Sequence, residues 1–211
     1  MSRSLADSRR WMTLGTEVIA DAASRLDDES FDAATPLPGW TRKHLLAHVA
    51  SNAEAIGHLI HWAATGVETP MYASADDRAA GIAKGPTMSP TELRSWLSSS
   101  AECLGAAMGQ LTQEQWQQQV VTAQGRTVPA TETPWMRARE VCVHSVDLAV
   151  GIGFADLPDD FNRALCADIQ GKRGLAHLPP EVADAPLPQL TAWLAGRPHT
   201  IPDAPELAPW L

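Results

Sequence analysis

A glutamate and a histidine stand four residues apart in "AREVCVHSVDLA", residues 138–149, a segment otherwise suited to a helix in a protein core. Positions i and i+4 of an α-helix lie on the same face about one turn apart, so Glu140 and His144 can bind one metal ion. Cys142 then points elsewhere and is expected in the core, and Asp147 either supports the site or lies on the helix surface. The spacing predicts part of a metal site, but a Glu-x-x-x-His pair also occurs as an exposed ion pair.

A further ligand is expected from an earlier helical segment that is rich in histidine, "RKHLLAHVASNAEAIGHLIHWAATG". Its histidines are His44, His48, His58 and His61. His48 fits best because it shares the inward stripe with Leu45 and Asn52, whereas His58 and His61 lie near the far end. Two nitrogens and one carboxylate oxygen leave a tetrahedral Zn²⁺ with an open fourth position, as in a catalytic site. The alternative for His48 is a hydrogen-bonded histidine of the core.

The elements that position these residues are predicted to be four long helices. Apolar residues recur at helical spacing over about residues 4–28, 41–66, 89–108 and 133 to about 151 or 153. Ser89, Pro90 and Glu92 form a capping-box pattern at the start of the third helix. The pattern predicts an antiparallel four-helix bundle over residues 1–153.

The connections differ in length. Residues 67–88 mix glycine, proline and charge, which predicts a long loop with one short helical turn. Loops of this length in compact domains tend to be functional. In residues 119–130, "QVVTAQGRTVPA", β-branched residues on either side of a glycine-centred turn predict a small irregular hairpin.

The region after the bundle, residues 154–211, is predicted to be a short appendage without a fold of its own. A fifth helix is expected near "DDFNRALCADIQG", followed by a proline-rich stretch. A short helix, "LTAWLAGR", and an extended tail ending in "APWL" complete it. The fold class is therefore mainly α, with a reduced C-terminal extension or a small α/β appendage.

Composition excludes several classes of function. The chain has 211 residues, 45% hydrophobic and 19% charged, with a net charge of -9. Such a surface does not favour nucleic acid or an anionic membrane, because both need clustered lysine and arginine. No apolar run is long enough to span a membrane, and the N-terminus lacks a signal peptide's apolar core. Three cysteines without CxxC spacing fit reduced thiols. We expect a cytoplasmic protein and a monomer.

Two long segments resemble a known family. "GWTRKHLLAHVASNAEAIGHLIHWAATGVETPMY" and "VVTAQGRTVPATETPWMRAREVCVHSVDLA" are similar to the mycothiol-dependent maleylpyruvate isomerases, and the ending "LAGR" with "APWL" resembles that family's C-terminus. The resemblance implies a DinB-like bundle that holds a divalent metal, normally zinc, through His, Glu and His. Residue by residue, these ligands are His48, Glu140 and His144, the same three residues that spacing selects.

The resemblance also implies an activity. The family converts maleylpyruvate, the cis isomer, to fumarylpyruvate, the trans isomer, in gentisate breakdown, and mycothiol is regenerated. A carbon–carbon double bond does not rotate, so a thiolate must add to the enone, allow rotation about the resulting single bond, and leave. Zinc binds sulfur and lowers the pKa of a thiol ligand. The implied cofactors are therefore Zn²⁺, or another divalent metal, and mycothiol.

One arginine is implied in the chemistry. The family has an essential arginine in a Gly-Arg pair after its last helix, which matches Arg197 in "WLAGRPHT". Its role would be to stabilise the enolate of the adduct. The segment between the fifth helix and this pair looks shorter than the usual C-terminal α/β domain of the family, so the placement of Arg197 is open.

Other polar residues are candidates for binding the substrate carboxylates, which arginine matches with two parallel hydrogen bonds. Arg126 is the first, because its glycine-centred turn directly precedes the metal-binding helix, and Arg78 in the long loop is the second. Arg137 and Arg139 compete with them, and for each of the four arginines the alternative is a solvated surface charge. Tyr72 is a candidate proton donor. The residues that contact mycothiol are not identified.

Two other functions fit the same residues. A mycothiol S-transferase would use the same metal and thiol but release the adduct. A zinc-binding regulatory module would need a closed site with a fourth protein ligand, which Cys142 does not supply. The isomerase is favoured because "HWAATGVETPMY" and "VVTAQGRTVPATET" match the family beyond the metal ligands.

Overall fold

The computed structural model describes residues 3–207 and 210, and these residues form eight α-helices and one two-stranded sheet. The helices are α1 (Leu5–Arg25), α2 (Arg42–Thr65), α3 (Ala75–Ala83), α4 (Pro90–Gln110), α5 (Thr133–Asp147), α6 (Asp159–Arg173), α7 (Pro180–Ala183) and α8 (Leu187–Leu194), and the strands are β1 (Gln119–Val121) and β2 (Thr127–Pro129). Single 3-10 turns lie at Glu29–Asp32, Gly85–Thr87, Gln115–Gln117, Ala130–Glu132 and Phe154–Asp156. No helix in this part of the chain is long and apolar enough to cross a membrane.

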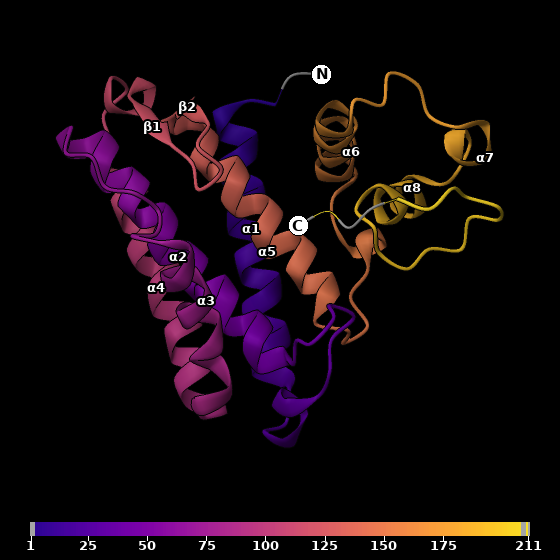
Figure 1. The fold of residues 1–211 in the computed structure, drawn as a ribbon, viewed down its shortest axis with the longest axis horizontal. Coiled ribbons are helices and arrows are strands. Elements are labelled where there is room, and N and C mark those ends of the chain that lie inside the picture. Colours follow the sequence, from indigo (N-terminus) through magenta and orange to yellow (C-terminus); the bar gives the residue numbers. More distant parts are fainter. Residues whose placement is uncertain (1–2, 208–209, 211) are drawn as a thin grey trace. The chain divides into compact units, whose positions relative to one another are not determined.

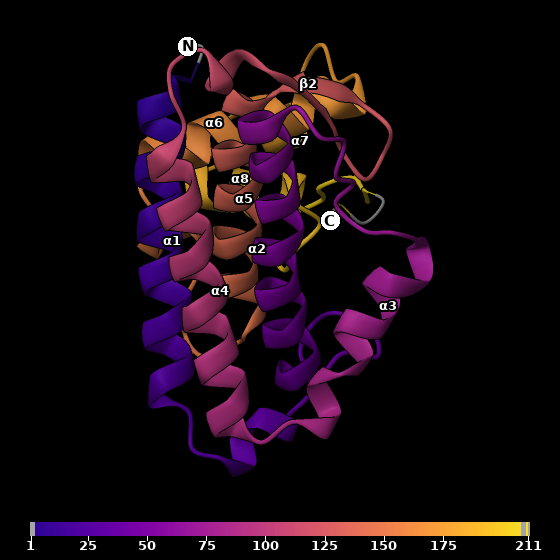
Figure 2. The ribbon, with the colours of Figure 1, turned by 90° about the vertical axis from the view of Figure 1, so that its left-hand side faces the viewer.

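The chain divides into two compact units. Residues 4–150 form the first and contain α1 to α5, and the second begins at Gly151. The division therefore falls three residues before the expected boundary at residues 153 and 154. The predicted four-helix bundle is confirmed in the first unit, where α1, α2, α4 and α5 stand side by side (Figures 1 and 2).

The first helix packs along the helix that carries Glu140 and His144, and the two run parallel. The indoles of Trp11 and Trp135 meet edge to face with their centroids 5.7 Å apart. Gly15, one turn after Trp11 on α1, lies directly against Cys142, which comes about two turns after Trp135 on α5. The thiol of Cys142 is buried and donates to the carbonyl of Trp11 over 3.7 Å.

The second helix crosses this pair in the opposite direction. His48 lies against Glu140 near the start of α2, whereas Asn52 contacts Arg137, which comes earlier in α5. Later residues of α2 therefore contact earlier residues of α5, so the two helices are antiparallel. This antiparallel pair brings the histidine-rich segment and the "AREVCVHSVDLA" segment face to face.

The long connection between α2 and α4 returns the chain to the end where α2 began. Trp96 donates to Glu54 at 2.6 Å, and Gln115 beyond α4 donates to the carbonyl of Ala64, so α2 and α4 run parallel. Parallel neighbours in a bundle require such a crossover. The connection contains the nine-residue helix α3, longer than the single turn predicted from the sequence, because Ser74 caps it by accepting from the backbone N–H of Asp77.

The helix that carries Glu140 and His144 ends at Asp147, earlier than the predicted glycines at 151 and 153. Ala149 has a φ of 53° and leaves the helix. The guanidinium of Arg42 donates to the carbonyls of Leu148 at 2.8 Å and of Ala149 at 3.0 Å. These carbonyls have no helical partner at a helix end, so Arg42 of α2 satisfies them and favours the early stop.

Sequence signals for the other local elements are confirmed. Ser89 and Glu92 form the reciprocal capping box that opens α4. The predicted hairpin is β1 paired with β2, with Val120 opposite Val128. Gly125 in its turn has a φ of 74°, a conformation that glycine adopts without strain. The first helix ends at Arg25, three residues before the expected end.

We expect Gly15→Ala to destabilise the bundle. A Cβ at Gly15 would lie 2.5 Å from the sulfur of Cys142 and 3.1 Å from its backbone nitrogen, so α1 and α5 would have to separate. This overpacking outweighs alanine's better helix propensity, and we expect a net loss of about 1–2 kcal/mol in unfolding free energy. Urea unfolding measures it. Gly105→Ala is the control, because a Cβ at Gly105 meets nothing within 4 Å; equal effects of the two substitutions would contradict this account.

The second unit contains α6 and α8 as its main helices, which pack against each other. The described residues from 151 onward include no strand, so the α/β appendage considered from the sequence is helical here. Gly196 has a φ of 66°, and the N–H groups of Gly196 and Arg197 bond back to the carbonyls of Trp193 and Ala192. This Schellman arrangement ends α8 and explains the glycine of the Gly-Arg pair. Of the "APWL" ending, only Trp210 lies within the described residues.

Candidate metal centre

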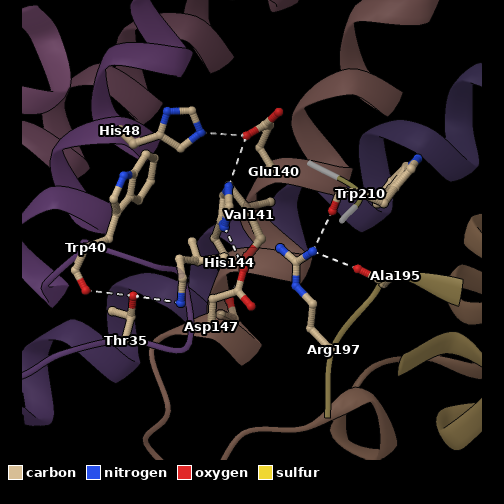
Figure 3. A network of polar contacts seen from close by, with 12 residues as sticks. Thr35, Trp40, His48, Glu140, Val141, His144, Asp147, Ala195, Arg197 and Trp210 are labelled. Atoms are coloured by element: carbon tan, nitrogen blue, oxygen red, sulfur yellow. Dashed lines mark hydrogen bonds and ion pairs between the residues drawn. The ribbon is translucent and has the colours of Figure 1, made fainter. Parts of the chain in front are cut away.

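The three ligands expected from the sequence come together in the first unit (Figure 3). His48 Nε2 lies 3.0 Å from Glu140 Oε2, and His144 Nε2 lies 3.3 Å from the same oxygen. One ligand atom from each residue lies within 4.8 Å of the other two. Both histidines are buried, and 16% of the Glu140 side chain remains exposed. The arrangement offers two nitrogens and one carboxylate oxygen on the same side.

Two helices position these side chains rigidly. Glu140 and His144 are one turn apart on α5, so their side chains share a face as the spacing predicted. His48 reaches them from α2, and its ring meets the ring of His144 edge to face at 5.0 Å. The indole of Trp40, which precedes α2, also meets the His48 ring edge to face, with the ring centroids 5.2 Å apart. Trp40 thus restricts the rotation of His48 and forms part of the wall beside it.

The two histidines of the triad differ in protonation: burial lowers the pKa of His144, but its contacts with Asp147 and Glu140 outweigh this effect and raise that pKa. Burial raises the pKa of Glu140, but hydrogen bonds from His144 and His48 outweigh it and hold that pKa well below its ordinary value. Burial lowers the pKa of His48, more than its contact with Glu140 raises it. Glu140 is therefore ionised at neutral pH and His48 is neutral. These are the forms in which the two groups bind a metal ion.

Asp147 supports His144 from behind, which resolves the alternatives left open by the sequence. Its Oδ2 lies 2.9 Å from His144 Nδ1, and the residue is buried (Figure 3). This contact leaves Nε2 of His144 to face Glu140. Carboxylate–histidine pairs of this kind fix the ring and its ligand nitrogen in metal sites.

We expect Asp147→Asn to weaken metal binding while the fold is retained. Asparagine keeps the shape but removes the charge that holds the Nδ1 proton of His144. Loss of such a partner typically lowers metal affinity about 10- to 100-fold. Zn²⁺ competition against a chromogenic chelator measures it. Ser145→Ala, which removes a 2.6 Å bond to the carbonyl of Val141 in the same turn, should leave affinity unchanged. An unaltered affinity in Asp147→Asn would refute the supporting role.

Cys142 is not available as a fourth ligand. It faces α1, its sulfur is buried against Trp11 and Gly15, and burial strongly raises the pKa of its thiol. Cys142 therefore stays a neutral thiol of the core, as the sequence indicated. No other His, Cys, Asp or Glu in the described part of the chain joins the three residues in a metal-binding group.

The two arginines predicted to bind substrate differ in their surroundings. Arg78 is exposed on α3, yet its charge lowers the pKa of Tyr72 and that of His48. Burial raises the pKa of Tyr72, and the charge of Glu140 raises it further. Arg126 is exposed in the β1–β2 turn, where its backbone N–H donates to Thr122 Oγ1. Arg78 and Tyr72 thus lie close enough to the triad for their charges to interact with His48 and Glu140.

Arg137 contradicts the sequence-based expectation of a solvated surface charge. It is fully buried, and its Nη1 donates to the carbonyl of Val49 at 2.6 Å and to Asn52 Oδ1 at 2.9 Å. Burial lowers its pKa to about 10, so it is still protonated at neutral pH. The available signal was the spacing of polar residues on one face of α5. Arg137, Glu140, His144 and Asp147 follow one another at intervals of three, four and three residues.

Arg197 belongs to the second unit, where it is 6% exposed. Its Nη1 donates to the carbonyl of Ala195 at 2.7 Å and to that of Trp210 (Figure 3). The guanidinium therefore links the end of α8 to the C-terminal tail. Its catalytic role stays a prediction.

Comparison with known proteins identifies the family. A family model described as "Mycothiol maleylpyruvate isomerase N-terminal domain" matches residues 12–149, which include all three residues of the triad. The chain belongs to this family. A solved structure described as that of "the mycothiol-dependent maleylpyruvate isomerase" is 36% identical, with a TM-score of 0.86. The match covers 97% of this chain and 98% of that one, so this member of the isomerase family and its relative are nearly equal in extent.

Two further structures match. A variant of the solved mycothiol-dependent isomerase, in which one histidine is replaced by alanine, is 35% identical with a TM-score of 0.85, over 97% of this chain and 98% of that one. The Bacillus subtilis protein YfiT, described as having "an unusual four-helix bundle topology", is 19% identical with a TM-score of 0.53. That match covers 70% of this chain and 89% of YfiT, and it supports the fold alone. No curated protein sequence matches the chain.

Proposed function

We propose that this chain catalyses the mycothiol-dependent isomerisation of maleylpyruvate to fumarylpyruvate, with a divalent metal ion held by His48, Glu140 and His144. The observation that carries the proposal is the convergence of these three side chains from two helices in a chain of the isomerase family. The 36% identity to a solved mycothiol-dependent maleylpyruvate isomerase over nearly the whole chain supports the substrate and the thiol. A place in gentisate breakdown follows from that substrate.

The donor atoms fit a metal such as zinc. Zn²⁺ binds imidazole nitrogen and carboxylate oxygen, and catalytic sites use three protein ligands with one position left for another group. The described residues offer three ligands and a supporting carboxylate, Asp147, but no fourth ligand. When bound, such an ion lowers the pKa of a thiol that coordinates it, so the thiol becomes nucleophilic near neutral pH.

The chain's own residues have separable roles in the proposed reaction. Glu140 contributes the single negative charge of the ligand set, which leaves the site net positive toward a thiolate and a dicarboxylate substrate. Arg78, beside Tyr72, is proposed to bind a substrate carboxylate at the triad, and Arg126 is a further candidate. Arg197 is proposed to stabilise the negative charge that develops on the pyruvyl oxygen after the thiolate adds. The thiolate then leaves, so mycothiol is regenerated and no proton or electron is lost.

The test is turnover by the purified full chain loaded with Zn²⁺, incubated with mycothiol and maleylpyruvate. We expect fumarylpyruvate to form over many turnovers without consumption of the thiol. Omission of mycothiol, and removal of metal with a chelator, should each abolish the reaction, and reloading with Zn²⁺ should restore it.

Other outcomes would favour the other two functions. A thiol–substrate conjugate that accumulates in proportion to mycothiol would contradict the isomerase and support an S-transferase. Zinc binding without either product would support a metal-binding module.

A further inference from the structure

Arg137 is the most unusual polar residue of the bundle outside the triad. Its side chain is fully buried, and its two hydrogen-bond acceptors are a backbone carbonyl and a side-chain amide, neither of which is charged. Its Nε and Nη2 atoms are also buried and have no hydrogen-bond partner. Within residues 3–207 and 210, no carboxylate therefore bonds to this guanidinium in the core.

This arrangement does not favour stability. A buried polar group without a partner destabilises the folded state, and a charged group does so more strongly. An apolar side chain of similar volume in place of a buried charge is often neutral or stabilising. A contribution to the fold alone therefore does not explain an arginine at this position.

The acceptors of Arg137 show what it holds in place. The carbonyl at 2.6 Å belongs to Val49, the residue next to His48. The amide belongs to Asn52, one turn after His48 on α2. Arg137 itself lies one turn before Glu140 on α5, and the two charges interact. The side chain thus joins the turn that carries one metal ligand to the turn that carries another.

We propose that Arg137 is a positioning residue of the metal site, which holds His48 at ligand distance from Glu140. The inference rests on the metal site of the proposed function. The bonds to Val49 and Asn52 fix the position of α2 along its axis relative to α5, because sliding either helix by one residue would break both bonds. The buried positive charge of Arg137 also adds to the net positive charge that the site presents to an anionic ligand.

The experiment compares variants of the full chain by Zn²⁺ affinity and by stability. Arg137→Met keeps the apolar stem and removes the donors, and Arg137→Lys keeps the charge and one donor group. Arg94→Met is the matched control, because Arg94 also joins two helices through two carbonyls, those of Ala23 and Leu26, but away from the triad. Zn²⁺ affinity is measured by competition with a chromogenic chelator, stability by urea unfolding, and geometry from the visible absorption of the Co²⁺-loaded protein.

We expect Arg137→Met to weaken Zn²⁺ binding about 10- to 100-fold, the range found for residues that orient metal ligands. The visible absorption of the Co²⁺-loaded Arg137→Met variant should lose intensity. Arg137→Lys should recover part of the Zn²⁺ affinity and part of the Co²⁺ absorption. Arg94→Met should lower stability but leave the Zn²⁺ affinity within about twofold of that of the unaltered chain. The helices that Arg94 joins, α4 and α1, carry none of the three metal ligands.

The inference is overturned if Arg137→Met binds Zn²⁺ as the unaltered chain does, or if Arg94→Met weakens binding equally. Should Arg137→Met fail to fold, Asn52→Ala removes one acceptor and keeps the arginine; an unchanged affinity in that variant overturns the inference too. These measurements use neither thiol nor maleylpyruvate. A chain that shows the expected affinities but no isomerisation would contradict the proposed function and leave the positioning role standing.

Discussion

Replacing His48 with alanine is expected to remove metal and turnover together. His48 is the sole ligand of the triad from α2, and the two that remain lie one turn apart on α5. Zinc sites with four ligands have apparent binding free energies of about 10–16 kcal/mol. An equal share per ligand is about 3 kcal/mol, which corresponds to a loss of about 100-fold in affinity. Metal content after dialysis and the rate of fumarylpyruvate formation measure the two effects.

The control for this substitution is His61→Ala, which removes an exposed histidine from the same helix. It should retain both metal and rate. His48→Ala also takes a partner from Glu140, so circular dichroism and urea unfolding are needed to show that the variant is folded. Full metal content in folded His48→Ala would mean that the ligand assignment is wrong.

Replacing Arg197 with alanine is expected to leave the metal content unchanged and to lower kcat/KM. A preorganised donor to an oxyanion is worth about 10²–10³ in rate when it is removed. Arg197 lies in a different unit from the triad, so its loss should not disturb metal binding. Metal analysis and steady-state kinetics on the same preparation separate the two effects. Arg197→Lys, which keeps the charge, should recover part of the rate.

A structural role of Arg197 requires its own control, because its guanidinium links Ala195 to Trp210. Trp193→Phe removes a comparable link, the 2.7 Å bond from the indole N–H to the carbonyl of Pro205. If both variants lose the same rate, Arg197 acts by holding the C-terminal tail. An unimpaired rate in Arg197→Ala would place the stabilising cation elsewhere.

The helices of the bundle were predictable because their signals are local. Apolar periodicity located α1, α2, α4 and α5, and Ser89 with Glu92 marked the start of α4 within one residue. The end of α5 was not predictable, since Arg42, more than a hundred residues earlier, satisfies the carbonyls at which the helix stops. The sequence predicted only one short helical turn where the nine-residue helix α3 lies, because its alanines and aspartates give no apolar stripe.

The same distinction applies to the site. Glu140 and His144 were predictable from their spacing on one helix, and His48 from the inward stripe of another. The burial of Arg137 was not, because arginine on a helix is usually solvated, and only the packing of α2 against it places Val49 and Asn52 within reach. Asp147 could be assigned a role only once the orientation of the His144 ring was known.

The separation of the ligands along the chain has a consequence for folding. His48 and Glu140 are 92 residues apart, so a metal ion shared between them closes a loop of that length. In the chain-entropy model, a covalent cross-link across about 100 residues stabilises the native state by about 4–5 kcal/mol. A coordinated ion is a reversible counterpart of such a cross-link. The resistance of the bundle to unfolding would then rise and fall with the free concentration of the metal.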